Sequence, residues 1–428
     1  MRLYNTLGRR IDEISIPKQA KIYVCGPTVY DYSHVGHGRI YVTFDVLRRL
    51  WEHEGSRVKF VMNITDIDDK MIRRAHERGI SVSELATAMA WAFVEDLKTL
   101  NVKLPSVIPF ATGHVPDIID IIKRLEKKDF AYASSDGVYF RVRRFGDYGK
   151  LSGARIEELK AGARIEPGDK EDPLDFSLWK FQKPGEPSWD SPWGAGRPGW
   201  HIECSAMIHR HLGEPIDIHG GGADLIFPHH ENEIAQSEAA FDRPLAKTWM
   251  HVGLLRIRGE KMSKSLGNII PLREAFKRWG AMPLRLFYLL HYYREPVEIE
   301  DITEAQTLWR RLVRRLSFSG DFSQEDYEAV EAALLNNLDT RAAVQEFIRR
   351  AARGRSHWAD KTLDLLGLTL PRRRMEPVKK LLEVRRALRA RRLFDLSDKI
   401  REALEMTGME ILDNGDETEV IVYDSNNS

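Results

Sequence analysis

The fold of this chain follows from residues 22–37, which are Ile-Tyr-Val-Cys-Gly-Pro-Thr-Val-Tyr-Asp-Tyr-Ser-His-Val-Gly-His. The apolar run at the start predicts a buried strand, and apolar residues from Ile40 to Leu50 recur at helical spacing. A strand, a tight turn and a helix N-terminus together form an anion site, because backbone N–H groups and the helix dipole point at the ligand. We therefore predict a phosphate site at the start of this helix.

Two histidines occupy the predicted turn. His34 and His37 are three residues apart and therefore lie on one side of it. There they can donate hydrogen bonds to phosphate oxygens whose charge grows in a transition state. Gly36 has no side chain, so a nucleotide base can approach the backbone closely. An ordinary helix start has the same spacing, and on this motif alone that alternative stays open.

A second candidate phosphate element is Lys261-Met262-Ser263-Lys264-Ser265, which glycines flank at 259 and 267. We predict a loop that closes on a leaving pyrophosphate, with charge from Lys261 and Lys264. A solvated lysine loop is the alternative. The two strings in this order are far more specific than either alone, and they resemble the two motifs of class I aminoacyl-tRNA synthetases.

Size and composition limit the class of protein. The chain has 428 residues, which suggests two or three domains, and its 43% hydrophobic and 30% charged residues exclude a disordered or membrane-embedded protein. The first residues contain no apolar leader, so we expect a cytoplasmic protein. Two cysteines cannot build a disulfide framework and favour a metal or structural role.

The net charge of +1 hides an uneven distribution. Between Arg372 and Arg392 there are ten Lys or Arg against Glu376 and Glu383. This excess is a candidate surface for nucleic-acid phosphates. A solvated helix face is the other interpretation.

The order of elements predicts an α/β fold with a parallel sheet and crossover helices. Strands are expected at Ile22–Cys25, Arg57–Ile64 and Ile216–His219, and helices up to about Trp51, over Val82–Leu100 and around His201–His211. Residues 101–198 form an insertion, which ends in an irregular loop over 183–200. From about Thr303 the chain is mostly helical, with a short strand at Thr418–Tyr423 and a disordered tail.

Four residues that lie far apart in the sequence are candidate metal ligands. Cys25 ends the first strand, Cys204 lies in the predicted helix around 201–211, and His229 and Glu233 are four residues apart on one helical face. Two thiolates, an imidazole and a carboxylate form a plausible zinc set. A buried core cysteine and a surface His–Glu pair remain the alternative from spacing alone.

Several blocks up to about residue 300 resemble cysteinyl-tRNA synthetases: Val24–Asp31, Asn63–Asp69, Gly199–Cys204, Asp217–Glu233 and Lys261–Asn268. The resemblance implies that Cys25, Cys204, His229 and Glu233 hold one zinc ion in the amino-acid pocket. The departure within the motifs is mild, since Val35 stands where isoleucine is commoner.

The resemblance also implies the domain organisation. A Rossmann-like catalytic domain is expected over 1–100 and 199–260, interrupted by the insertion over 101–198. The lysine loop and a stem-contact region occupy 261–310. A helical domain for tRNA anticodon binding, shorter than usual, occupies 311–428.

The implied activity is ATP-dependent ligation of L-cysteine to tRNA(Cys) through a cysteinyl-adenylate, with Mg²⁺ accompanying ATP and the protein acting as a monomer. ATP contacts are assigned to His34, Gly36, His37, Asp224 and Lys264. Gly26, Thr65 and Trp200 are assigned to the amino acid. Zinc selects cysteine because a serine hydroxyl is a far poorer ligand than a thiolate.

Two other functions stay open at this point. A cysteine:amine ligase of the mycothiol-biosynthesis type resembles the same catalytic fold and also activates cysteine. A zinc-stabilised, tRNA-binding paralogue without activity would keep the fold but would have no use for the paired histidines and lysines.

Overall fold

A parallel four-stranded sheet forms the centre of the molecule, in the order β10-β9-β3-β4. The computed structural model describes residues 1–428 apart from 154–167, 263–266, 372–375, 407–408, 415–416 and 423–428. The four strands of the sheet are β3 (Gln19–Val24), β4 (Arg57–Met62), β9 (Ile216–Gly222) and β10 (Ala246–Val252). The three strands expected from the sequence are confirmed, and β10 is an addition.

Helix α1 (Val35–His53) follows β3 and packs on the sheet, as predicted. Gly220 of β9 makes this approach possible, since a Cβ there would lie 2.0 Å from the Phe44 ring. Helices α3 (Val82–Thr99), α6 (Trp200–His211) and α7 (Glu231–Phe241) share buried clusters with residues of the sheet, and α2 (Asp69–Arg78) packs on α3. The expected helices over 82–100 and 201–211 are therefore confirmed.

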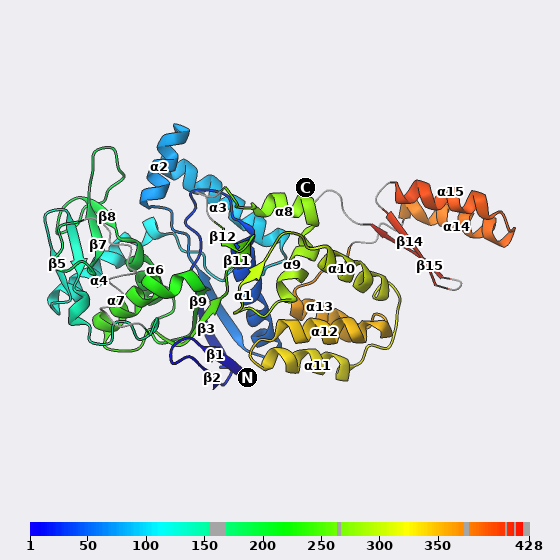
Figure 1. The fold of residues 1–428 in the computed structure, drawn as a ribbon, viewed down its shortest axis with the longest axis horizontal. Coiled ribbons are helices and arrows are strands. Elements are labelled where there is room, and N and C mark those ends of the chain that lie inside the picture. The colour runs from blue at the N-terminus through cyan, green and yellow to red at the C-terminus, as the bar shows by residue number, and fades with distance from the viewer. Residues whose placement is uncertain (154–167, 263–266, 372–375, 407–408, 415–416, 423–428) are drawn as a thin grey trace.

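The region from 101 to 198 carries helix α4 and an antiparallel sheet, on the left in Figure 1. Its elements are α4 (Val115–Lys127), β5 (Ala131–Ala133), β6 (Gly137–Phe140), β7 (Phe176–Phe181) and β8 (Gly196–Pro198). The expected irregular loop over 183–200 is wrong at its end, because β8 pairs with β7 and Trp200 opens α6. The core of this region includes Ile202 of α6 and Ala235 of α7, so it joins the main sheet through these two helices.

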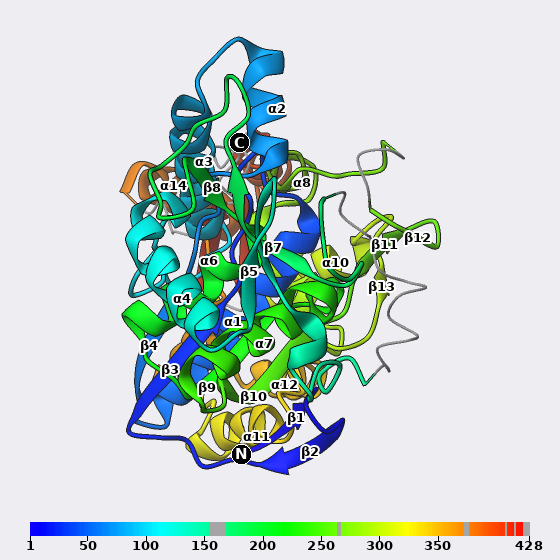
Figure 2. The same cartoon turned by 90° about the vertical axis from the view of Figure 1, so that its left-hand side faces the viewer.

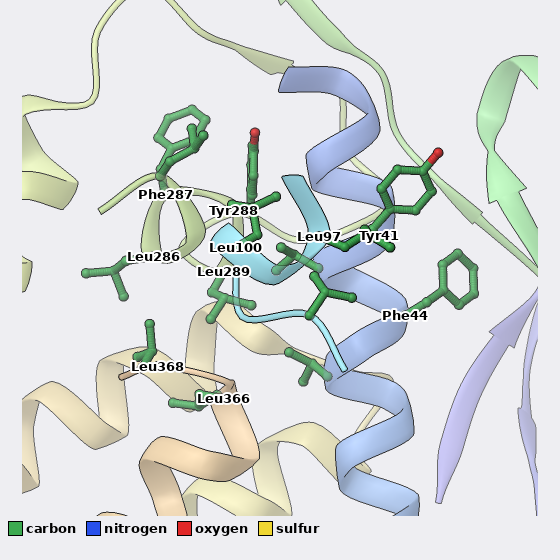
Figure 3. Close-up of a cluster of buried hydrophobic side chains, with 14 of the residues drawn as sticks. Tyr41, Phe44, Leu97, Leu100, Leu286, Phe287, Tyr288, Leu289, Leu366 and Leu368 are labelled. Atoms are coloured by element: carbon green, nitrogen blue, oxygen red, sulfur yellow. The ribbon is translucent and has the colours of Figure 1, made fainter. Parts of the chain in front are cut away.

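The chain from 255 to 370 shares the large core of the sheet. Figure 3 shows Leu286–Leu289 and Leu366 in the same cluster of buried side chains as Tyr41 and Phe44 of α1. The elements here are β11 (Leu255–Ile257), β12 (Glu260–Lys261), α8 (Leu272–Trp279), α9 (Ala281–Leu289), β13 (Val297–Glu298), α10 (Thr303–Arg315), α11 (Gln324–Leu335), α12 (Thr340–Arg350) and α13 (His357–Leu366). A buried Arg285 reinforces the contact by pairing with Asp45 of α1 and donating to the Leu366 carbonyl.

The last elements form a C-terminal module, residues 376–422, at the far right of Figure 1. It contains α14 (Glu376–Ala390), α15 (Phe394–Glu405), β14 (Met409–Asn414) and β15 (Glu417–Val422). The predicted strand at 418–423 corresponds to β15, and the tail beyond it lies outside the described residues. The module has a small core of its own, made of Val378, Leu382, Leu404, Ile411 and Val420.

A short hairpin of β1 (Arg2–Asn5) and β2 (Arg10–Glu13) precedes the sheet. The loop that joins β1 to β2 contacts β10, because the Thr6 N–H donates to the Trp249 carbonyl. Within the described part of the chain, no helix combines the length and apolar character needed to cross a bilayer.

Candidate active site

The four predicted metal ligands meet beyond the end of β3, although up to 208 positions separate them in the sequence. Cys25 directly follows β3, Cys204 lies on α6 and Glu233 lies on α7. His229 belongs to a π turn (η4, Ile226–His230) just before α7, not to that helix as predicted. It still meets Glu233, with 3.0 Å between Nε2 and Oε1. Each of the four side chains is buried.

The distances within this set fit a tetrahedral zinc ion. Two sulfurs about 2.3 Å from zinc lie about 3.8 Å apart at the tetrahedral angle, and the sulfurs of Cys25 and Cys204 are 3.8 Å apart. Cys204 Sγ is 3.6 Å from His229 Nε2, and Cys25 Sγ is 3.5 Å from Glu233 Oε1. The residues present therefore fit the metal that the resemblance implies.

The cluster is electrostatically prepared for a cation. Burial alone would raise the pKa of Cys204, but hydrogen bonding to Cys25 and the His229 imidazole lowers it to about 6. Burial raises the pKa of Cys25 well above its ordinary value, and Cys204 adds to this shift. The pKa of Glu233 falls well below its usual range, since His219 and His229 outweigh its burial. One thiolate and one carboxylate are thus favoured even before a metal binds.

Four further histidines surround the ligands, and the sequence analysis missed all of them. His219 Nε2 lies 2.7 Å from Glu233 Oε2, and His201 Nδ1 lies 2.9 Å from His229 Nδ1. His230 Nε2 is 3.3 Å from Cys25 Sγ, while its Nδ1 is 2.8 Å from His251. Such partners hold metal ligands in one orientation and tautomer. Three of them, His201, His219 and His230, lie within the sequence blocks that resemble cysteinyl-tRNA synthetases. Their number in those blocks was the signal that could have identified them as partners of the ligands.

A second set of side chains also meets the geometric requirement for a metal: Cys25, His219, His230 and Glu233. It shares two ligands with the first set and replaces a thiol by an imidazole. Zinc binds thiolates strongly, so the set with two cysteines fits zinc better than the second set does.

The two turn histidines cap α1 with their own side chains. The Gly36 N–H donates to His34 Nδ1 at 3.1 Å, and the His34 N–H donates to His37 Nδ1 at 3.4 Å. A neutral imidazole that accepts at Nδ1 carries its proton on Nε2. Their rings stack with centroids 3.8 Å apart, so both lie on one side of the turn, as predicted. Burial lowers the pKa of His37, and the neighbouring His34 lowers it further by a smaller amount. The His37 side chain is therefore kept neutral.

The segment around the second motif packs against this turn. The Val35 N–H donates to the Ile270 carbonyl at 3.0 Å, and the Leu272 N–H donates to the Ser33 carbonyl at 2.9 Å. A Cβ on Gly36 would lie 2.9 Å from the Met262 methyl group, so a larger residue would disturb both motifs. Lys261 belongs to β12, and Lys264 lies outside the described residues.

Asp224, assigned to ATP, lies just after β9, in the short helical turn η3 (Ala223–Leu225). Its carboxylate is exposed. A Cβ on Gly222 would lie 2.6 Å from Asp224 Oδ1 and 3.2 Å from Ile40 of α1. Asp224 is therefore close to the first turns of the helix that carries the two histidines.

The residues assigned to the amino acid surround the metal cluster. A Cβ on Gly26 would lie 1.7 Å from the Asn63 carbonyl oxygen, so only glycine fits there. The Thr65 hydroxyl donates to Glu203 at 2.9 Å. Trp200 is 37% exposed and stacks on His229, with ring centroids 4.3 Å apart. Trp200 thus lies against one side of the cluster, and its contact with the amino acid stays a prediction.

The basic stretch from 372 to 392 is not one uniform face. Its first four residues lie outside the described part of the chain. Arg385 is buried and forms a two-pronged ion pair with Asp413, with both distances 2.8 Å. Lys380, Arg386, Arg389, Arg391 and Arg392 are exposed. The expected basic surface therefore keeps at least five of its ten cations, and one of the ten is structural.

Comparison with known proteins adds independent findings. A family model described as the catalytic domain of class I (C) tRNA synthetases matches residues 12–307. A cysteine–tRNA ligase of Pyrococcus abyssi is 44% identical over 467 aligned residues, which cover 98% of each chain. A cysteine–tRNA ligase of a Nostoc species is 48% identical over 80% of this chain and 74% of its own length.

Solved structures share the fold at low identity. Methionyl-tRNA synthetase of Mycobacterium tuberculosis, in complex with methionyl-adenylate, has a TM-score of 0.58 and 16% identity, and the match covers 82% of this chain and 88% of that one. The Agrobacterium radiobacter LeuRS in a complex with tRNA and LeuAMS also has a TM-score of 0.58, at 12% identity and 83% coverage of both chains. The expected Rossmann-like α/β fold is confirmed.

Proposed function

The chain belongs to the class I aminoacyl-tRNA synthetases and, within them, to the cysteine–tRNA ligases, and on this premise we propose that it joins L-cysteine to tRNA(Cys) through a cysteinyl-adenylate. The observation that carries the proposal is the buried set of two thiols, an imidazole and a carboxylate directly after β3. The same strand leads into the histidine turn of α1. This arrangement supports an amino-acid pocket next to a phosphate site.

In the proposed first step, the cysteine carboxylate attacks the α-phosphate of ATP and pyrophosphate leaves. His34 and His37 donate from Nε2 to phosphate oxygens, since their Nδ1 atoms already accept backbone protons. Lys261 and Lys264 stabilise the departing pyrophosphate, and Mg²⁺ accompanies ATP. The terminal ribose hydroxyl of tRNA then takes the cysteinyl group, so no covalent enzyme intermediate is needed.

Cys25, Cys204, His229 and Glu233 would hold the zinc ion. When bound, zinc supplies a soft Lewis acid that favours the substrate thiolate over a serine hydroxyl. The surrounding histidines fix the ligands, and Trp200 covers the side of the pocket. We also assign residues 311–428, which include the exposed basic residues of α14, to tRNA, and expect a cytoplasmic monomer.

The decisive experiment is cysteine-dependent ATP–pyrophosphate exchange, with zinc measured on the same sample. We expect exchange with cysteine, rejection of serine by about 10⁴-fold, and one zinc per chain. Transfer assays then compare tRNA(Cys) with a glucosamine–inositol acceptor. Transfer to the amine alone would support the cysteine:amine ligase, and absence of exchange would support the inactive paralogue.

A further inference from the structure

Arg273 joins three separate parts of the chain beside the histidine turn. It is the second residue of α8, and its guanidinium lies over the ring of Tyr32, 4.8 Å from the ring centroid. Its Nε donates to Asp96 Oδ1 on α3 at 3.3 Å, and its Nη2 donates to the Ala92 carbonyl at 3.4 Å. Tyr32 stands two residues before His34. One side chain therefore connects α8 and α3 to the start of the turn.

Asp96 gives Arg273 a fixed anchor on α3. The Asp96 side chain is buried, and its Oδ2 has no hydrogen-bond partner among the described residues. Burial raises the pKa of Asp96 to about 6; Arg273 opposes this shift, whereas Glu95 adds to it. Glu95 is exposed and pairs with Lys98 at 2.8 Å. At pH 8 the Asp96 carboxylate is therefore ionised, and Arg273 supplies its opposite charge.

The same face of α3 also supports the two histidines. Phe93 is three residues before Asp96, so the two side chains lie on one side of the helix. The Phe93 ring meets Tyr41 of α1 edge-on, with centroids 5.2 Å apart, and Tyr41 stacks on His37 at 6.2 Å. Helix α3 thus reaches the histidine turn in two ways, through the ring of Phe93 and through the ion pair of Asp96 with Arg273.

We propose that Arg273 is a positioning residue for the histidine turn. It holds Tyr32 against α3 and α8, and it thereby fixes the direction in which His34 donates from Nε2 to phosphate oxygens. Backbone hydrogen bonds between residues 33–35 and 270–272 join the turn to the start of α8, and the contacts of Arg273 join it to α3 as well. The inference rests on the proposed function, which assigns His34 to the phosphates of ATP.

The main test is Arg273→Gln in cysteine-dependent ATP–pyrophosphate exchange at pH 8. We expect kcat to fall about 10- to 100-fold, because a displacement of about 1 Å at the reacting groups can cost about 100-fold. The KM for cysteine and the zinc content should stay within about threefold, since the affected contacts act on the transition state. Arg273→Lys keeps the positive charge and should recover most of the lost kcat. Arg278→Gln is the matched control, because Arg278 is exposed on the same helix and lies over the ring of its neighbour Trp279, 4.9 Å from the centroid.

Variants of Tyr32 and Asp96 test the contact from its other ends. Arg273→Gln leaves a buried carboxylate without its cation, so Tyr32→Leu serves as a second variant that changes an exposed ring and keeps the ion pair. We expect Tyr32→Leu to lower kcat about two- to fivefold, in line with a cation–π contact at an exposed site, and Tyr32→Phe to leave it unchanged. Asp96→Asn should also lower kcat, and its combination with Arg273→Gln should be no worse than the poorer single variant.

The readouts separate the inference from the proposed function. An unchanged kcat in Arg273→Gln and Tyr32→Leu would overturn the inference, as would a loss that appears in the KM for cysteine or in zinc content. These results would leave cysteine-dependent exchange by the unaltered protein, and with it the proposed function, intact. If Arg273→Gln does not fold, the two variants of Tyr32 decide. A lack of exchange by the unaltered protein would overturn both.

Discussion

In the buried metal cluster, ionisable side chains are withdrawn from water, whereas in the C-terminal module apolar side chains face it. Each of the four ligands is buried, and each lies within 3.6 Å of another ligand. In the module, Leu381, Val384, Phe394 and Leu396 are 44–51% exposed. At least six exposed cations lie on the same pair of helices or the turn between them. The two regions thus depart from ordinary burial in opposite directions.

This contrast shows where residue types alone indicate a function and where they do not. A ligand set needs particular donor atoms at fixed distances, so the residue types alone indicate the chemistry. An exposed mixture of apolar and basic side chains gains its meaning only from a partner. Apolar contacts with bases and pairing with phosphates are what RNA offers such a surface. The following predictions test each side of the contrast.

The largest effect is expected in the cluster, from Cys204→Ser. The hydroxyl is a poor ligand for zinc, and the remaining three ligands stay buried. We expect zinc content to fall and the rate of cysteine activation to drop by about 1000-fold or more. The loss should exceed the roughly 100-fold reached when a residue that only hydrogen-bonds to a metal ligand is replaced. Ser237→Ala on α7 is the control, since its buried hydroxyl has no partner within the described chain. Full activation by metal-free protein would remove the basis for the zinc site.

A smaller effect, confined to tRNA, is expected from removing the module. The module has its own core and, among the described residues, contributes only Ile421 and Leu412 to the main core, whereas α10–α13 share the core of the sheet. A chain that ends after Leu370 should keep cysteine-dependent exchange and lose tRNA charging on the order of 100-fold in kcat/KM, because phosphate contacts are removed. A chain that ends after Ser317 should not fold, since Leu363 and Leu366 are lost from the main core. Normal charging by the first truncation would exclude the module from tRNA recognition.

Sequence reasoning reached the strands from local apolar runs, and it reached the four ligands from their residue types together with the resemblance to a known family. Apolar runs predict β3, β4 and β9, but β10 was missed, since Lys247 and His251 interrupt its apolar residues. The ligands follow from residue type, whereas His219 and His251 act through contacts that only the folded chain creates. Likewise, a count of charges cannot show that Arg385 turns inward to Asp413.

The missed histidines supply the next prediction. His251 lies 2.8 Å from His230, which in turn faces Cys25, and Thr6 fixes His251 from the other side at 2.8 Å. His251→Ala should weaken zinc binding about 10-fold, the lower end for the outer partners of a metal site. Competition with a chelator measures the affinity, and His209→Ala on the half-exposed end of α6 is the control. An unchanged affinity would mean that the ligands alone hold the metal.

The smallest effect is expected from replacing Arg386, Arg391 and Arg392 by Gln in the full chain. All three are exposed, so their loss should not disturb the core of the module, in contrast to buried Arg385. If they contact phosphates, affinity for tRNA should fall about fivefold at physiological salt, and the slope of log affinity against log salt should decrease by about one for each contact. The control is a triple Gln variant of Lys123, Arg124 and Lys127, which are exposed on α4. This helix lies at the opposite end of the molecule in Figure 1, the end that faces the viewer in Figure 2. An unchanged slope in the variant of Arg386, Arg391 and Arg392 would show a solvated surface, and the contrast between the two regions would then rest on the exposed apolar side chains alone.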